Sequence, residues 1–159
     1  TDMETVMKQD LVLDTMFSEE ETENFFTVLD RLPDLRVMIE HIAGVKIDGN
    51  KPDSKWTDTM RRAASYPNVY LKVSALMENS TMQPAPADVA FYTPTIDTLR
   101  DCLGDDRLVY GSNWPVCERA GTYARCIEIV RSYYEDKEQS IRDKFFAGNS
   151  QALYRWNPR

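Results

Sequence analysis

The 159-residue chain has 19 basic and 26 acidic residues, a net charge of −7, and 42% of its residues are apolar. This length and apolar content suffice for one domain with a buried core, and the acidic balance argues against binding to a nucleic-acid backbone. No apolar run approaches the roughly 18–20 residues of a membrane span, and no signal peptide is visible. We therefore expect a cytoplasmic protein that binds neither nucleic acid nor membrane.

Four short runs rich in Val, Ile, Leu and Tyr have the composition of β-strands. They are "LVLDTMF" (11–17), "RVMIEHI" (36–42), "VYLKVSAL" (69–76) and "RLVYG" (107–111). Each precedes a stretch with helical spacing, so the pattern predicts an α/β fold with parallel strands and right-handed crossovers. Two architectures fit this pattern: a small doubly wound sheet, and half of a (β/α)8 barrel.

The predicted helices carry their own boundary signals. Ser18 is the expected N-cap of the first, and Gly104 is the expected residue after the helix in "TPTIDTLRDCLG". Gly148 is expected to separate two short helices in "SIRDKFFAGNSQALYRW". The polar, proline-containing segment 77–87 is expected to form a loop over the carboxyl end of the sheet.

Three cysteines, Cys102, Cys117 and Cys126, lack the spacing of a metal or redox motif. We expect free thiols in a reducing cytosol. The alternative is that Cys117 is a nucleophile, but no base stands near it in the sequence.

The stretch "RLVYGSNWPV" (107–116) ends in residues typical of the end of a strand. Gly111 is expected to let the backbone turn, and Pro115 stops the strand because it lacks an N–H. Asn113 and Trp114 would then lie at the carboxyl end of the strand, where α/β folds place their chemistry. An amide at position 113 can orient a water molecule but cannot deprotonate it near neutral pH.

Four motifs in order over residues 30–156 resemble one family, the amidohydrolase-related (amidohydrolase 2) TIM-barrel lactonases, which include fuconolactonases and 2-pyrone-4,6-dicarboxylate lactonases. The motifs are "LPDLRVMIEHIAG", "YPNVYLKVSAL", "DDRLVYGSNWPV" and "FFAGNSQALYRW". The resemblance implies that residues 1–159 form a partial barrel domain, strands five to eight of a TIM barrel with their helices. The first residue is Thr1, and we expect the chain to begin inside a longer one.

The resemblance also implies roles for individual residues. His41 would polarise a lactone carbonyl or ligate a metal; the alternative is a strand-end histidine bonded to the backbone. Asn113 stands where most members carry the aspartate that activates water, so we expect it to position water or substrate, or else to cap the turn. Trp114, Lys72 and Ser74 are candidate substrate-binding residues. Lys72 and Ser74 share one face of a strand, and the residues alone leave open which face it is.

The cofactor expectation follows from the family's N-terminal half. That half carries a His-X-His pair, and this sequence has a single histidine. The resemblance therefore implies either a divalent metal such as zinc, completed by groups outside these residues, or catalysis without metal.

We expect the chain to be the C-terminal part of a metal-dependent or metal-independent hydrolase that acts on a lactone or related cyclic ester. We expect this chain alone to be inactive. The alternative is a non-catalytic half-barrel, stable as a homodimer or when paired with a separate N-terminal chain.

Overall fold

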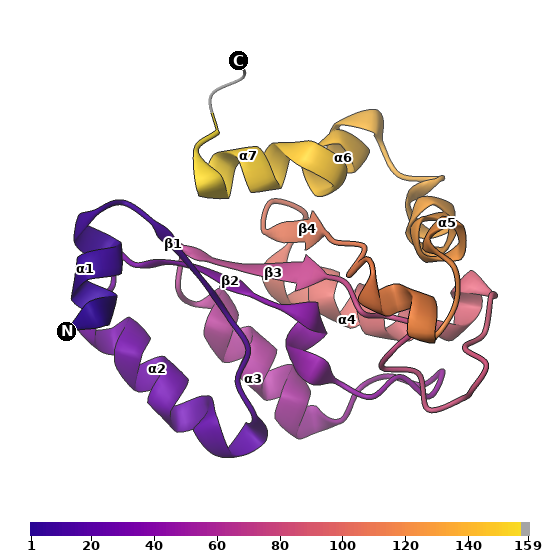
Figure 1. Cartoon of the computed structure of the whole chain (residues 1–159), viewed down its shortest axis with the longest axis horizontal. Coiled ribbons are helices and arrows are strands. Elements are labelled where there is room, and N and C mark those ends of the chain that lie inside the picture. Colours follow the sequence, from indigo (N-terminus) through magenta and orange to yellow (C-terminus); the bar gives the residue numbers. More distant parts are fainter. Residues whose placement is uncertain (157–159) are drawn as a thin grey trace.

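The computed structural model describes residues 1–156, and its centre is one parallel sheet. The strands β1 (Val12–Thr15), β2 (Arg36–Ile39), β3 (Val69–Val73) and β4 (Leu108–Tyr110) lie in the order β1–β2–β3–β4. All four lie within the predicted runs, and the prediction of parallel strands is confirmed. Chain order and spatial order coincide, so β1 and β4 are the two edges of the sheet (Figure 1).

Helices follow each strand, as the spacing predicts, and one further helix precedes β1. They are α1 (Asp2–Lys8), α2 (Thr22–Arg31), α3 (Ser54–Ala64), α4 (Thr93–Leu103), α5 (Tyr123–Tyr134), α6 (Gln139–Asp143) and α7 (Asn149–Tyr154). Ser18 closes a capping box with Glu21 just ahead of α2, and Gly104 ends α4 with a φ of 72°. Helix α1 was not predicted from the sequence because it buries no residue. Within residues 1–156, no helix is long and apolar enough to cross a membrane.

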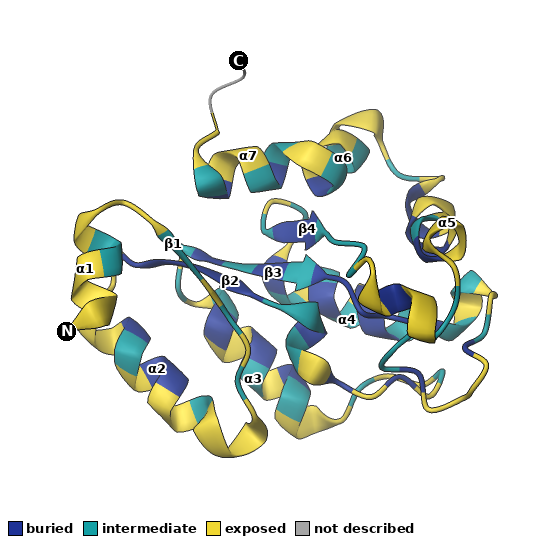
Figure 2. Ribbon diagram, viewed as in Figure 1, coloured by how far each residue is buried: buried dark blue, intermediate teal, exposed yellow. Residues whose placement is uncertain are grey.

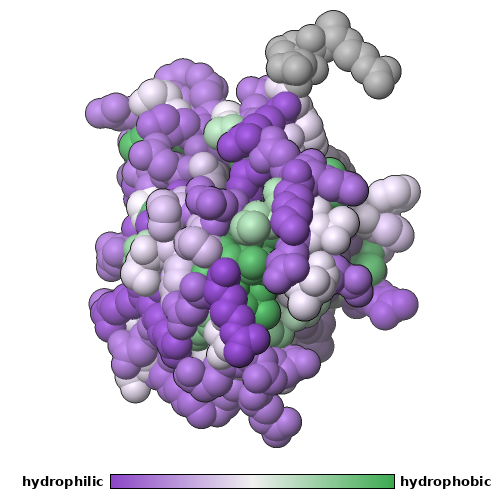
Figure 3. Space-filling view, turned by 90° about the vertical axis from the view of Figure 1, so that its left-hand side faces the viewer, coloured by the Kyte–Doolittle hydropathy of each residue, from purple (hydrophilic) through white to green (hydrophobic). Residues whose placement is uncertain are grey.

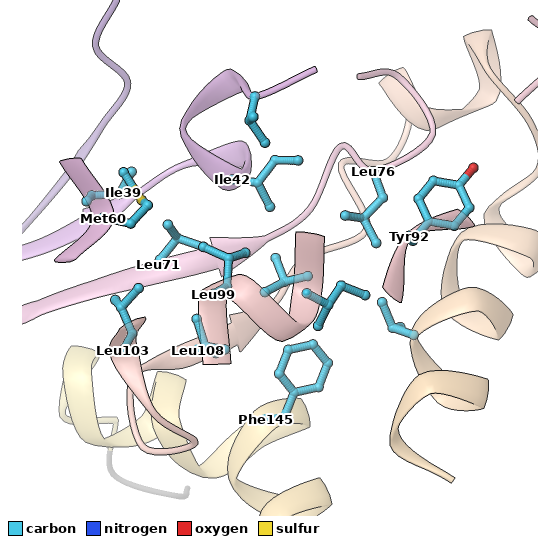
Figure 4. Close-up of a cluster of buried hydrophobic side chains, with 14 of the residues drawn as sticks. Ile39, Ile42, Met60, Leu71, Leu76, Tyr92, Leu99, Leu103, Leu108 and Phe145 are labelled. Atoms are coloured by element: carbon cyan, nitrogen blue, oxygen red, sulfur yellow. The ribbon is translucent and has the colours of Figure 1, made fainter. Parts of the chain in front are cut away.

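The main core lies between the sheet and helices α2 to α5. Alternate strand residues such as Ile39, Leu71 and Leu108 are fully buried there, and Leu99 of α4 packs among them (Figures 2 and 4). Parallel strands with crossover helices bury this face completely, which explains the near-continuous Val, Ile and Leu content of the four runs.

The opposite face of the sheet, here called the inner face, carries the remaining strand residues. There Met38 of β2 and Val109 of β4 form a second cluster with Leu153 of α7. The Arg36 guanidinium donates hydrogen bonds to the carbonyls of Leu153 and Asp10, which ties α7 to the sheet. Figure 1 shows α7 on the side of the sheet opposite α2 and α3. Figure 3, which views the molecule from the side of α1, shows an apolar patch between hydrophilic residues.

The prediction that Gly148 separates two helices is wrong. Residues 139–154 run on as α6, a π-helical turn over Lys144–Gly148, and α7, and Gly148 itself is helical with φ −58° and ψ −42°. The turn buries Phe145 against Tyr134, with ring centroids 4.1 Å apart. That packing outweighs the low helix propensity of glycine, because one glycine within a helix costs only about 1 kcal/mol relative to alanine.

Asp105, in the turn before β4, predicts an acid-sensitive contribution to stability. Arg100 donates two hydrogen bonds to its carboxylate, at 2.6 and 2.9 Å, and this guanidinium lowers the pKa of Asp105. Because the pKa is lower in the folded state, the contribution is complete above the unfolded pKa of about 4 and is lost as the pH falls through the folded value.

We expect Asp105→Asn to lower the free energy of unfolding by about 1 kcal/mol at pH 7, a value reduced for the partial exposure of the pair. The difference should shrink in urea titrations below about pH 4. Asp101→Asn, at an exposed position of α4, is the matched control. A deficit that stays constant down to pH 2 would contradict the assignment.

Candidate active site at the carboxyl ends of the strands

Polar side chains replace apolar ones on the inner face where the strands end. Leu71 and Val73 are buried in the main core, so Lys72 and Ser74 alternate to the inner face, which settles the orientation that the sequence left open. Glu40 follows β2 at the same level, because Ile39 pairs with Leu71. The carboxyl ends of β2 and β3 therefore present His41, Lys72 and Ser74 together.

Among the described residues, the Nδ1 atom of His41 has one hydrogen-bond partner, and the Glu40 carboxylate lies near it, with Oε2 at 3.7 Å. Nδ1 lies 2.7 Å from the hydroxyl oxygen of Ser74, which is 1% exposed, whereas the His41 side chain is 26% exposed. If Ser74 donates to Nδ1, then Nε2 carries the proton and can donate to a carbonyl; if Nδ1–H donates to Ser74, then Nε2 is free to bind a metal. The two roles predicted for His41 thus correspond to its two tautomers.

Backbone strain is concentrated at these strand ends. His41, Ala75 and Asn113, which follow β2, β3 and β4, have φ values of 53°, 56° and 55°. Left-handed backbone costs an L-residue other than Asn or Asp roughly 1–2 kcal/mol. Such strain is typical of sites where side-chain direction matters more than stability.

Lys72 takes part in a network of carboxylates that the sequence did not reveal. Its ammonium hydrogen-bonds to the Glu40 carboxylate and lies 3.9 Å from Asp14 Oδ2. The Tyr154 hydroxyl of α7 in turn donates to Asp14, with oxygen distances of 2.7 and 2.8 Å. Lys72 therefore has anionic partners within this chain. The same inner-face alternation that places Lys72 could have pointed to Glu40.

Removing this lysine predicts a measurable loss of stability. The Lys72 and Glu40 side chains are 22% and 15% exposed, so Lys72→Met would leave a largely buried carboxylate without its cation, at a cost of about 1–3 kcal/mol. Lys55→Met is the control, because Lys55 and Glu19 form an ion pair that is 72% and 69% exposed, and it should change stability by less than about 1 kcal/mol. Equal effects in urea unfolding would contradict this reading of the network.

Gly111 brings β3 and β4 close together. Its φ is not positive, so the turn expected there does not depend on the left-handed conformation that glycine allows. A Cβ at this position would lie 2.8 Å from side-chain carbons of Lys72 and 3.0 Å from Cβ of Ser74. Glycine is needed because these side chains occupy the space.

Asn113 and Trp114 have different surroundings. The Asn113 amide donates to Glu78 Oε1 at 2.7 Å, a contact with the loop after β3 that the sequence did not indicate. Trp114 is 62% exposed, and its indole N–H donates to Glu118 at 3.2 Å. Trp114 is therefore not packed in the core, and its role in substrate binding stays a prediction.

The cysteines and the possible metal ligands complete the set of predicted reactive groups. Cys102, Cys117 and Cys126 are free, as expected, and burial raises the pKa of each thiol, that of Cys126 to about 11. Such thiols are neutral at pH 7 and are poor nucleophiles. Among residues 1–156, no group of three His, Cys, Asp or Glu side chains could hold a metal ion. These residues supply at most one imidazole ligand, from His41, and do not by themselves fit a zinc site.

A comparison with protein families settles the relationship that these motifs indicate. The model of the amidohydrolase family matches residues 23–156. The chain belongs to the amidohydrolase family. Among curated proteins, this amidohydrolase chain is 28% identical over 160 residues to an L-fucono-1,5-lactonase of Burkholderia ambifaria, and 26% identical over 104 residues to one of Burkholderia multivorans. The first alignment covers 96% of this chain and 53% of that protein, so the chain spans about half the length of the curated relatives it matches.

Solved amidohydrolases share its fold. A Burkholderia multivorans amidohydrolase with bound HEPES superposes with a TM-score of 0.85 at 21% identity, over 96% of this chain and 56% of that one. Amidohydrolase 2 of Bifidobacterium longum subsp. infantis superposes with a TM-score of 0.74 at 21% identity, over 98% and 54%. A Bordetella bronchiseptica TIM-barrel protein matches with a TM-score of 0.60 at 17% identity, over 95% and 48%. The four parallel strands are thus half of a TIM barrel rather than a doubly wound sheet.

A half-barrel explains why a cavity of about 580 Å³ does not lie at His41. The cavity lies between the loops that follow β1 and β2, with Phe17, Trp56 and Met60 among its walls. It touches the His41 turn only through Ala43 and Gly44. In a complete barrel the inner face is enclosed by the strands opposite, whereas four strands leave it open on one side.

Proposed function

We propose that these residues form the C-terminal half of a hydrolase that opens a lactone or related cyclic ester, with His41 donating a hydrogen bond to the carbonyl oxygen. The observation that carries the proposal is the contact between Nδ1 of His41 and buried Ser74, which occupies one ring nitrogen and leaves Nε2 for a substrate. Polarising a carbonyl in this way stabilises the negative charge that develops on its oxygen. The two relatives named as lactonases support the substrate class.

The other predicted residues have supporting roles in this proposal. Asn113 positions the attacking water, Trp114 lines the pocket, and Lys72 and Ser74 contribute to substrate binding. Because Lys72 is already paired with Glu40, we propose that it presents a fixed polar surface to hydroxyl groups of the substrate rather than a free cation to an anion.

The test uses the complete reading frame that encodes these residues. Acid release from five- and six-membered sugar lactones is followed at constant pH, with spontaneous hydrolysis subtracted and with a chelator present or absent. Catalysed ring opening of at least one lactone is expected, and failure on every lactone would contradict the proposal. Loss of activity with chelator would support a metal-dependent reaction, whereas unchanged activity would support direct polarisation of the carbonyl by His41.

A second candidate, a non-catalytic half-barrel stabilised by pairing, is favoured by the two sheet edges. The edge strands β1 and β4 each leave one row of backbone groups without a neighbouring strand of the sheet. We propose that a second copy or an N-terminal half covers these edges. Light scattering on the 159-residue chain tests the first of these: a dimer would support pairing between copies, whereas a stable monomer would contradict pairing between copies.

A further inference from the structure

Beside Asn113 lies a carboxylate that the sequence did not connect to it. Glu78 is on the loop after β3, and its Oε1 accepts the hydrogen bond from the Asn113 amide at 2.7 Å. Both residues are half-buried. Asn113 itself cannot accept a proton, but it is in direct contact with a carboxylate that can.

The second oxygen of Glu78, Oε2, is buried and has no hydrogen-bond donor within the described residues. No lysine or arginine of the described chain forms an ion pair with Glu78 either. A buried carboxylate oxygen needs a donor, because leaving it without one costs at least about 1–3 kcal/mol. A water molecule about to lose its proton is such a donor.

Three titratable side chains near Glu78 have raised pKa values, and the Arg125 guanidinium also acts on one of them, Tyr92. Burial raises the pKa of Tyr92 to about 12 and that of Cys126 to about 11, and it also raises the pKa of Cys117; the nearby charge of Glu78 adds to each rise. All three side chains are neutral near pH 7. Asn113 cannot titrate, so it can orient Glu78 without neutralising it.

Glu78 extends from the same strand ends as the His41 site. Ser74, which holds His41, precedes Glu78 by four residues. Gly111 brings β4 into contact with Ser74, and Asn113 lies two residues further along. The pair formed by His41 and Ser74 and the pair formed by Asn113 and Glu78 are thus joined through the closest approach of β3 and β4.

We propose that Glu78 is the general base of this half-barrel and that Asn113 is its positioning residue. The inference rests on the proposed lactone hydrolysis. Glu78 Oε2 takes a proton from water while the water oxygen bonds to the carbonyl carbon, and the carbonyl electron pair moves onto the oxygen that faces His41. When the tetrahedral intermediate collapses, the ring C–O bond breaks and the departing oxygen takes the proton from Glu78. The product is an open-chain hydroxy acid, which releases its proton to solvent.

This arrangement makes a counterintuitive prediction for position 113. Asn113→Asp would place a second carboxylate against Glu78, and adjacent carboxylates share a proton, which raises the pKa of one of them. The variant should therefore shift the acid limb of the kcat/KM profile to higher pH rather than enhance activity. Exchanging the two groups in Glu78→Gln/Asn113→Asp restores one carboxylate and one amide across the same hydrogen bond.

The experiment compares Glu78→Gln, Asn113→Asp and the double variant in the complete reading frame, on the lactone that the wild type hydrolyses fastest, from pH 5 to 9. Glu78→Gln should lower kcat by about 10²–10⁴-fold with little change in KM, and should abolish the acid limb. The double variant should recover at least about tenfold of that loss. Glu128→Gln, at an exposed position of α5, is the control for removing one charge, and thermal unfolding checks that each variant is folded.

The outcomes separate the two proposals. A Glu78→Gln protein that keeps kcat within about threefold of wild type overturns the role of Glu78 and leaves lactone hydrolysis standing. If the double variant recovers no activity, the kcat/KM profile of Glu78→Gln decides. An acid limb that survives in this variant overturns the role of Glu78, whereas loss of the acid limb supports it. A wild type that hydrolyses no lactone overturns the proposed function, and the role of Glu78 with it.

Discussion

Replacing His41 by alanine is expected to lower kcat for lactone opening by about 10²–10³-fold, the usual cost of removing one hydrogen-bond donor from a developing oxyanion. The ring is fixed by Ser74 at 2.7 Å, so Nε2 is pre-oriented when substrate arrives. His41→Gln is the informative partner variant, because its amide N–H reaches about as far as Nε2 and should retain more activity than alanine. The measurement is kcat and KM of both variants in the complete reading frame.

Two results would contradict this role for His41. An alanine variant within about threefold of wild type would show that the ring does not touch the reacting carbonyl. Equal losses in the alanine and glutamine variants would favour metal ligation, because an amide is a poor substitute for imidazole at zinc. Ser74→Ala should have a smaller effect, about tenfold, because it loosens the ring without removing the donor.

The largest loss of stability from a polar substitution is expected at Asn149. This residue is 4% exposed, and its amide donates to the backbone carbonyls of Asp105 and Leu108, each at 2.8 Å. These contacts fasten the start of α7 to the amino end of β4. Asn149→Leu would leave both carbonyls without this donor and should lower the free energy of unfolding by about 2–4 kcal/mol in urea titrations.

Two further variants separate hydrogen bonding from packing at this position. Asn149→Asp preserves the shape but cannot donate, so its cost should equal or exceed that of leucine. Gln151→Ala, at an exposed position of the same helix, should change stability by less than about 0.5 kcal/mol. An aspartate variant as stable as wild type would show that the amide protons of Asn149 do not hold α7 in place.

Local pattern was sufficient for most of the fold. The four strands, the capping residue Ser18 and the helix end at Gly104 were all predicted, because each depends on residues within one or two turns of itself. Gly148 was misjudged for the opposite reason. Burial of Phe145 against Tyr134, contributed by another helix, overrode the local preference of glycine.

The candidate site was predictable only in part. His41, Lys72, Ser74 and Asn113 could be placed at strand ends from sequence, since chemistry in barrels gathers there. Their partners could not. The contact between Glu78 and Asn113 joins residues 35 positions apart through the path of a loop, and the contact between Lys72 and Glu40 joins residues 32 positions apart.

The sequence by itself determined the α/β class, the parallel direction of the strands and the residues available for chemistry. Only the tertiary structure decided which face of β3 carries Lys72 and Ser74, that α7 lies across the inner face, and that a carboxylate accompanies Asn113. The physical reason is that strand and helix formation follows local hydrophobic periodicity, whereas strand register and loop path are set by packing among distant segments.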